Sequence, residues 1–233
     1  MGNQSLLFIE TNMQSHTLSI VLATRNEEKN LLQCLESVKS IADEIIIADE
    51  SSTDKTVEIA KNFNAKVIRT KHQINFHITK NIAIDHATCE WTLQLDADEQ
   101  VSPDLAREIK EVINSNPPQN GFWLNRRNWF LSGFLKKGGQ YPDPTLRLYK
   151  TGFGRLPARD VHEQAIVQGK VGHLQYDLLH YRDRTFKKYL SGFSRYSSLI
   201  AHQLKTGDKP KNTLTPVKYL LISPVYTLSL IHI

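Results

Sequence analysis

Asp96 and Asp98, separated by one residue, are the pair in this sequence whose spacing most directly suggests a chemical function. They follow the strand-forming run Trp91-Thr-Leu-Gln-Leu95, so we expect the pair at the carboxyl end of a strand. Ligands bind at that edge of open α/β sheets. Two carboxylates there suit a hard divalent cation that itself holds a diphosphate, although the same pair could simply shape a turn.

The segments around this pair alternate between strands and helices. Strands are predicted at residues 18–23, 44–48, 66–69 and 91–95, and helices at residues 31–38, 57–63, 75–87 and 105–113. Ser102-Pro103-Asp104 is typical of the start of the last helix. The alternation predicts an α/β fold whose mostly parallel sheet carries helices on both faces.

Polar clusters follow three of these strands, at Thr24–Glu27, Asp49–Asp54 and Asp96–Asp98. If the strands are neighbours, the clusters meet in one crevice, as a nucleotide site requires. The sequence contains neither a Gly-x-Gly-x-x-Gly loop nor a P-loop. The phosphates of a nucleotide are therefore most simply held by a metal ion on Asp96 and Asp98.

From Pro117 the alternation stops. Antiparallel strands are predicted at residues 121–126, 145–149, 160–167 and 174–181, followed by an amphipathic helix over residues 185–205. The final residues, 219–233, carry no charge, and Pro224 together with the short length argues against a membrane span. We expect an interfacial or buried segment there, and a chain that is truncated within it.

The charge of the chain is unevenly distributed. The net charge of the 233 residues is +5, but residues 1–120 carry −7 and residues 121–233 carry +12. The basic half suits an anionic membrane surface or a phosphorylated substrate. Nucleic acid is an unlikely partner because no nucleic-acid-binding motif accompanies the charge. Cys34 and Cys89 are far apart, and the N-terminus has no basic flank before its apolar run, so a cytoplasmic, reducing location is expected.

With these features in place, the sequence resembles the family 2 glycosyltransferases of the GT-A fold, and more closely the lipopolysaccharide and lipooligosaccharide core β-1,4-glucosyltransferases. The matching segments are residues 18–38, 45–56, 80–81, 93–101, 141–148, 161–163 and 178–181. The resemblance covers roughly residues 17–205. It implies a nucleotide-sugar-binding half at residues 17–116, an acceptor-binding and metal-completing half at residues 117–205, an N-terminal extension at residues 1–16 and a membrane-associated tail at residues 206–233.

The resemblance also implies the roles of individual residues. Donor-binding positions would be Thr24, Asn26, Glu27, Asp49, Lys80, Asn81, Asp96, Ala97, Gly138 and Gly139, with Asp49 on the base and the two glycines near the sugar. Metal ligands would be Asp96, Asp98 and His180, and acceptor-binding positions would be Asp143, Arg147 and His162. Glu163 would be the catalytic base, with Asp160 as the alternative. Taken alone, Asp49 and Asp143 could equally shape turns, and His180 could be a core histidine.

The implied activity is metal-dependent, inverting transfer of a hexose, with UDP-glucose as donor and Mn²⁺ or Mg²⁺ as cofactor. The acceptor would be a lipopolysaccharide-core or other lipid-linked glycan at the cytoplasmic face of the inner membrane. A metal ion would neutralise the leaving diphosphate, and a carboxylate would take the proton of the acceptor hydroxyl. The alternative is a non-catalytic relative of the same fold that binds nucleotides or glycans.

Overall fold

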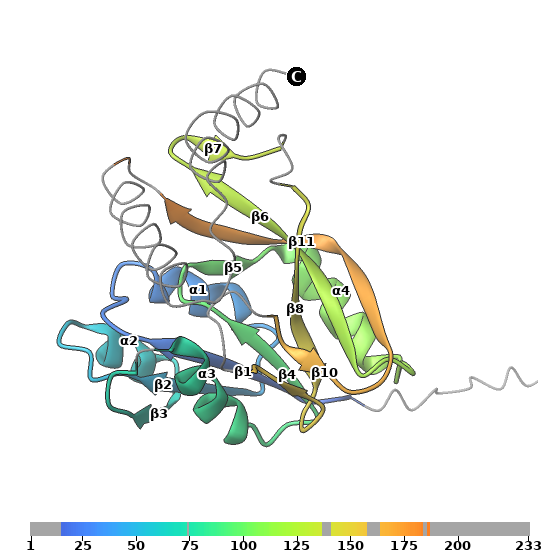
Figure 1. Cartoon of the computed structure of the whole chain (residues 1–233), viewed down its shortest axis with the longest axis horizontal. Helices are drawn as coiled ribbons and strands as arrows, with labels where there is room; N and C mark the ends of the chain where they lie inside the picture. The colour runs from blue at the N-terminus through green and yellow to red at the C-terminus, as the bar shows by residue number, and fades with distance from the viewer. Residues whose placement is uncertain (1–14, 74, 137–140, 158–163, 184–185, 187–233) are drawn as a thin grey trace, which may run out of the picture.

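The computed structural model describes residues 15–73, 75–136, 141–157, 164–183 and 186. Its first part alternates as the sequence predicts. The elements are β1 (Leu18–Thr24), α1 (Leu31–Val38), β2 (Glu44–Asp49), α2 (Thr56–Asn62), β3 (Lys66–Arg69), α3 (Phe76–Asp85), β4 (Trp91–Leu95), β5 (Glu99–Val101) and α4 (Pro103–Asn114). Strands β3, β2, β1 and β4 lie side by side in parallel (Figure 1).

The second part extends the same sheet. It contains β6 (Gly121–Phe130), β7 (Gly133–Phe134), β8 (Asp143–Lys150), β9 (Gly154–Arg155), β10 (Ile166–Val167) and β11 (Val171–Asp183). The strand order is β3-β2-β1-β4-β8-β6-β11-β5, with β7 paired to β6, while β9 and β10 form a separate ribbon. Strand β8 runs antiparallel to both β4 and β6.

One pairing differs from the sequence prediction. Residues 174–181 were expected in a further antiparallel strand. Strand β11 does run antiparallel to β5, but it runs parallel to β6, with His180 opposite Asn128. In the sequence, β8 lies between β6 and β11 and runs opposite to β6, so the chain can enter β11 in the direction of β6. This pairing brings Asn128 and His180, which are distant from each other in the sequence, next to the Asp96–Asp98 turn.

Helices cover both faces of the sheet because strand residues alternate between two apolar clusters. Ile20 and Leu22 of β1 belong to the cluster that includes α1 and α4, whereas Val21 belongs to the cluster that includes α3. Ser102 begins α4 as predicted, since its side chain accepts a hydrogen bond from the amide of Leu105. Among the described residues, no helix combines the length and apolar character needed to cross a membrane. The predicted helix at 185–205 lies outside the described residues, apart from residue 186.

Candidate active site

The turn that carries the two aspartates joins β4 to β5 at the carboxyl end of β4. Both ends of the turn are fixed: the amide of Glu99 donates to the carbonyl of Asp96 at 2.9 Å, and the amide of Asp96 donates to Glu99 Oε2 at 2.9 Å. Cys34 of α1 lies beneath it, with Sγ 3.6 Å from the Asp96 carbonyl. Burial, followed by the charges of the nearby carboxylates, raises the pKa of this thiol, so it is a packing residue.

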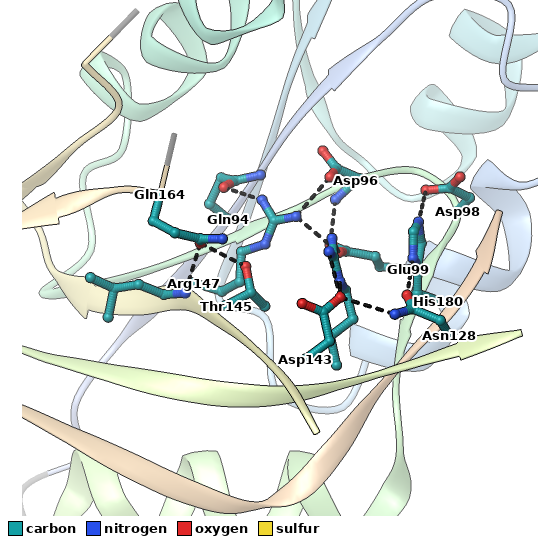
Figure 2. A network of polar contacts seen from close by, with 12 residues as sticks. Gln94, Asp96, Asp98, Glu99, Asn128, Asp143, Thr145, Arg147, Gln164 and His180 are labelled. Atoms are coloured by element: carbon teal, nitrogen blue, oxygen red, sulfur yellow. Dashed lines mark hydrogen bonds and ion pairs between the residues drawn. The ribbon is translucent and has the colours of Figure 1, made fainter. Parts of the chain in front are cut away.

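Asp96 lies between two cations, one of which, Arg147, is drawn beside it in Figure 2. Its Oδ1 is 2.5 Å from Lys80 Nζ of α3, and its Oδ2 accepts from Arg147 Nη2 of β8 at 2.7 Å. Burial by itself would raise the pKa of Asp96, but the charges of Arg147 and Lys80 outweigh it and lower that pKa strongly. Asp96 is therefore a permanent anion that holds two basic side chains at the edge of the sheet.

Glu99 is the buried anchor of this arrangement. Its side chain has no exposed surface, and its Oε1 accepts from Arg147 Nη2 at 2.9 Å and lies 3.6 Å from Arg126 Nη1. Gln94 of β4 contacts the other end of the Arg147 guanidinium. Sequence reasoning did not assign Glu99 a role, although its position directly after Asp98 was a signal available for finding it.

Asp98 begins a second chain of contacts, which runs through a histidine. His180 Nε2 of β11 lies 3.6 Å from Asp98 Oδ1, and His180 Nδ1 lies 2.6 Å from Asn128 Oδ1 of β6 (Figure 2). The amide of Tyr181 also donates to the Asp98 carbonyl at 2.8 Å. The structure thus brings together Asp98 and His180, which the sequence analysis predicted as partners in a metal site.

The tautomer of His180 follows from its neighbours. Asn128 Nδ2 donates to Asp143 Oδ2 at 2.9 Å, so the amide oxygen of Asn128 faces His180. Because that oxygen can only accept, His180 Nδ1 carries a proton, and in the neutral ring the lone pair of Nε2 faces the Asp98 carboxylate. Ligating histidines in metal proteins are held in this way by a hydrogen bond to the second nitrogen.

The spacing of Asp98 and His180 fits two ligands of one divalent metal ion. Two atoms about 2.1 Å from one ion lie roughly 3 to 4 Å apart, which matches the separation of Asp98 Oδ1 and His180 Nε2. In the described part of the chain, no group of three or more His, Cys, Asp or Glu side chains is arranged around a common metal position. Asp98 and His180 could therefore supply two ligands, while the Asp96 oxygens contact Lys80 and Arg147.

Asp143, a predicted acceptor residue, is engaged by the same network. Arg126 donates to Asp143 Oδ2 through Nε at 2.9 Å and Nη2 at 2.7 Å. Burial alone would raise the pKa of Asp143, but the hydrogen bond from Asn128 and the charge of Arg126 lower it. Arg147, the other described acceptor candidate, is 6% exposed. Its contacts with Asp96 and Glu99 suit a role in holding the site together.

The predicted nucleoside-binding residues lie at the ends of β1 and β2. Thr24 pairs with Asp49 in the parallel register, and its hydroxyl donates to Asp49 Oδ1 at 3.2 Å. Ser52 donates to the same carboxylate through its amide at 2.9 Å and its hydroxyl at 2.5 Å. Asn26 has φ 55° and accepts from the amide of Thr53 at 2.9 Å. These bonds fasten the loops after β1 and β2 to each other.

Glu27 lies within the loop after β1 and orders the approach to α1. Its backbone amide donates to Thr56 Oγ1 at 2.7 Å, and its carboxylate accepts from Asn30 Nδ2 at 2.8 Å. The residue therefore connects the start of α1 with the start of α2, next to the predicted nucleoside site.

Asn81 and Ala97 are buried beside the site. Asn81 Nδ2 donates to the Leu156 carbonyl at 2.9 Å, and Asn81 Oδ1 accepts from the Leu156 amide at 3.1 Å. Asn81 thus holds the segment after β9 against α3. Ala97 is 5% exposed, at the centre of the aspartate turn.

The remaining predicted site residues lie outside the described part of the chain. They are Gly138, Gly139, Asp160, His162 and Glu163. Gln164, which directly follows Glu163, is described. Its Oε1 accepts from Thr145 Oγ1 at 3.1 Å and from the Leu146 amide at 3.2 Å (Figure 2). The chain at residue 164 is therefore joined to β8, the strand that carries Arg147.

Comparisons with known proteins agree with this fold. The chain is 37% identical to the uncharacterized glycosyltransferase RP128 of Rickettsia prowazekii over 84% of its length and 70% of that protein. It is 27% identical to the lipopolysaccharide core biosynthesis glycosyltransferase LpsC of Rhizobium meliloti, over 91% of the chain and 80% of LpsC. The match to the uncharacterized glycosyltransferase RT0209 of Rickettsia typhi, at 39% identity, covers 42% of this chain but only 34% of that protein.

The fold comparison points the same way. The structure of S. aureus TarS, residues 1–349, superposes with a TM-score of 0.54 and 15% identity, over 83% of this chain and 67% of that one. This likeness confirms the predicted GT-A type of α/β fold. Residues 19–171 match the family described as Glycosyl transferase family 2. The chain therefore belongs to glycosyl transferase family 2.

Proposed function

We propose that the chain transfers a hexose, with inversion, from UDP-glucose to a lipopolysaccharide-core or other lipid-linked glycan, with Mn²⁺ or Mg²⁺ as cofactor. The observation that carries this proposal is the pairing of Asp98 with the Nε2 side of His180, whose Nδ1 is held by Asn128. The name of LpsC supports the class of acceptor, and a TarS structure in complex with UDP supports the class of donor.

The basic residues of the site complement an anionic donor. A bound metal ion would neutralise the charge that develops on the departing diphosphate. Lys80 and Arg147 are fixed on Asp96, so their positive charge is already in place at the carboxyl end of β4 before substrate arrives. Such preorganised charge needs little rearrangement during the reaction. Lys80 is the more accessible of the two cations, with 13% of its side chain exposed against 7% for Arg147.

A carboxylate base would complete the reaction. We propose Glu163 for this role, with Asp160 as the alternative, as the resemblance implies. The side chain of Gln164, the next residue along the chain, is bound to β8, the strand that carries Arg147. Asp143 is the weaker candidate, since its carboxylate is already engaged by Arg126 and Asn128.

The acceptor would be met at a membrane surface. Residues 121–233 carry a net charge of +12, which suits the anionic phosphates of a lipopolysaccharide core or of membrane lipids. We therefore propose a peripheral location at the cytoplasmic face of the inner membrane.

The test is release of UDP from UDP-glucose in the presence of Mn²⁺ and a lipopolysaccharide-core acceptor. Wild-type protein should release UDP only when metal and acceptor are both present, and Asp98→Asn should abolish the release while the protein stays folded. Asp104→Asn is the matched control, because that aspartate is exposed and paired with Arg107 on the surface of α4. UDP binding without any release would favour the non-catalytic relative instead.

A further inference from the structure

A buried glutamate next to the predicted nucleoside site has no role in the proposed chemistry. Glu50 follows Asp49 at the carboxyl end of β2, and only 2% of the residue is exposed. A carboxylate buried to this extent needs partners that satisfy its charge. Its partners come from two other elements, the loop after β3 and helix α3.

The first partner is a histidine at the surface. His72 Nδ1 lies 2.6 Å from Glu50 Oε2, and half of the His72 side chain is exposed. An ionised carboxylate can only accept hydrogen bonds, so His72 Nδ1 carries the proton of this contact, and the contact holds the ring in one orientation. Nε2 is the ring nitrogen that Glu50 does not contact, so it is the atom left to meet a ligand.

The second partner connects this pair to the donor site. Thr79 Oγ1 donates to Glu50 Oε1 at 2.5 Å from within α3, and the next residue is Lys80, which contacts Asp96. Glu50 therefore joins the helix that carries Lys80 to the loop that carries His72.

The loop itself is fastened to the residue predicted to bind the base. The amide of Thr70 donates to the Asp49 carbonyl at 2.8 Å, and Ser51 Oγ donates to the Thr70 carbonyl at 2.9 Å. His72 thus lies two residues beyond a direct contact with Asp49. Asp49 ends β2 and His72 follows β3, and these two parallel strands end at the same edge of the sheet, where a ligand is expected.

We propose that His72, oriented by the buried carboxylate of Glu50, is a donor-binding residue that contacts the nucleoside half of the sugar nucleotide. This inference rests on the proposed function. Glu50 is a positioning residue: it fixes the ring of His72 and, through Thr79, the start of α3. With the Nδ1 proton on the carboxylate, Nε2 of the neutral imidazole accepts a hydrogen bond, which a ribose hydroxyl or an N–H of the base can donate.

The test compares, by calorimetry in the presence of Mn²⁺, the affinities of uridine monophosphate and UDP for wild-type protein and for His72→Ala. A lost hydrogen bond should weaken both affinities by about two- to tenfold and by the same factor, because both probes share the nucleoside. His72→Gln, which can place its amide oxygen, an acceptor, near the position of Nε2, should recover part of the loss. The matched control is His86→Ala, at the far end of α3, where Nδ1 contacts the Ile82 carbonyl. It should bind both probes as the wild type does.

Three results would contradict the inference. Unchanged affinity of His72→Ala for both probes overturns the role of His72 and leaves the proposed function intact. A loss confined to UDP overturns the assignment to the nucleoside half, since the contact would then be to the second phosphate. Wild-type protein that is folded but binds neither probe overturns the proposed function, and the role of His72 with it.

Discussion

Arg147 offers the most demanding test of the buried charge network. Replacing it by methionine keeps most of the side-chain volume but leaves Glu99, which is fully buried, without its 2.9 Å partner. The nearest remaining cation is Arg126, at 3.6 Å. Asp96 would keep only Lys80. Removing one partner of a buried ion pair typically costs about 3 to 5 kcal/mol, because the other charge stays buried without compensation.

The loss should be visible in thermal unfolding followed by circular dichroism. For a domain of this size, 1 kcal/mol shifts the melting temperature by about 2 to 4 °C, so Arg147→Met should lower it by roughly 6 to 20 °C. The matched control is Arg155→Met, whose pair with Asp85 is exposed on both sides, at 61% and 49%. Exposed pairs contribute about 0 to 1 kcal/mol, and the control should melt close to the wild type.

A double variant separates charge from packing. Adding Glu99→Gln to Arg147→Met removes the uncompensated charge, so the double variant should be more stable than Arg147→Met alone. Arg147 and Glu99 would not form a mutually dependent buried network if Arg147→Met had the same melting temperature as the Arg155→Met control. The same would follow if adding Glu99→Gln to Arg147→Met did not raise the melting temperature.

Three further predictions concern the site. Glu163→Gln should keep UDP binding and lose turnover in a UDP-release assay, and unchanged turnover would move the base to Asp160 or Asp143. Asn128→Leu removes the acceptor for His180 Nδ1, so the affinity for Mn²⁺ in the presence of UDP should fall by about 10- to 100-fold, as seen when such supporting bonds are lost; affinity equal to the wild type would exclude this support. The pKa of Asp143 is lowered in the folded state, so the unfolded state binds more protons as the pH falls toward about 4, and stability is lost on acidification. Between pH 6 and pH 3, the denaturant midpoint of Asp143→Asn should therefore fall less than that of the wild type. An equal fall would show that the carboxylate is not stabilised by its partners.

The fold of the first part of the chain follows from local patterns. Continuous apolar runs such as Leu18–Ala23 predict buried parallel strands, and the Ser102-Pro103 pair marks the start of α4. The place of the aspartate turn at a strand end could be predicted for the same reason. These features depend on residues close together in the sequence.

The partners of the aspartates could not be predicted in the same way. Asn128 and His180 meet because β6 and β11 pair in parallel, and this register is set by packing between distant segments. The sequence did contain a weaker signal: Arg126 and Asn128 are two residues apart on one strand, so both side chains lie on the same face. The pairing of Asp96 with Lys80 likewise depends on how α3 packs, which local patterns do not determine.

Calorimetric titration with UDP, with and without Mn²⁺, asks directly whether Asp98 and His180 form a metal site for the donor. Wild-type protein should bind UDP much more tightly when Mn²⁺ is present, and Asp98→Asn should lose this difference while it keeps the melting temperature of the wild type. UDP binding that is the same with and without Mn²⁺, or the same metal dependence in Asp98→Asn, would contradict the assignment of Asp98 and His180 to a donor-linked metal site.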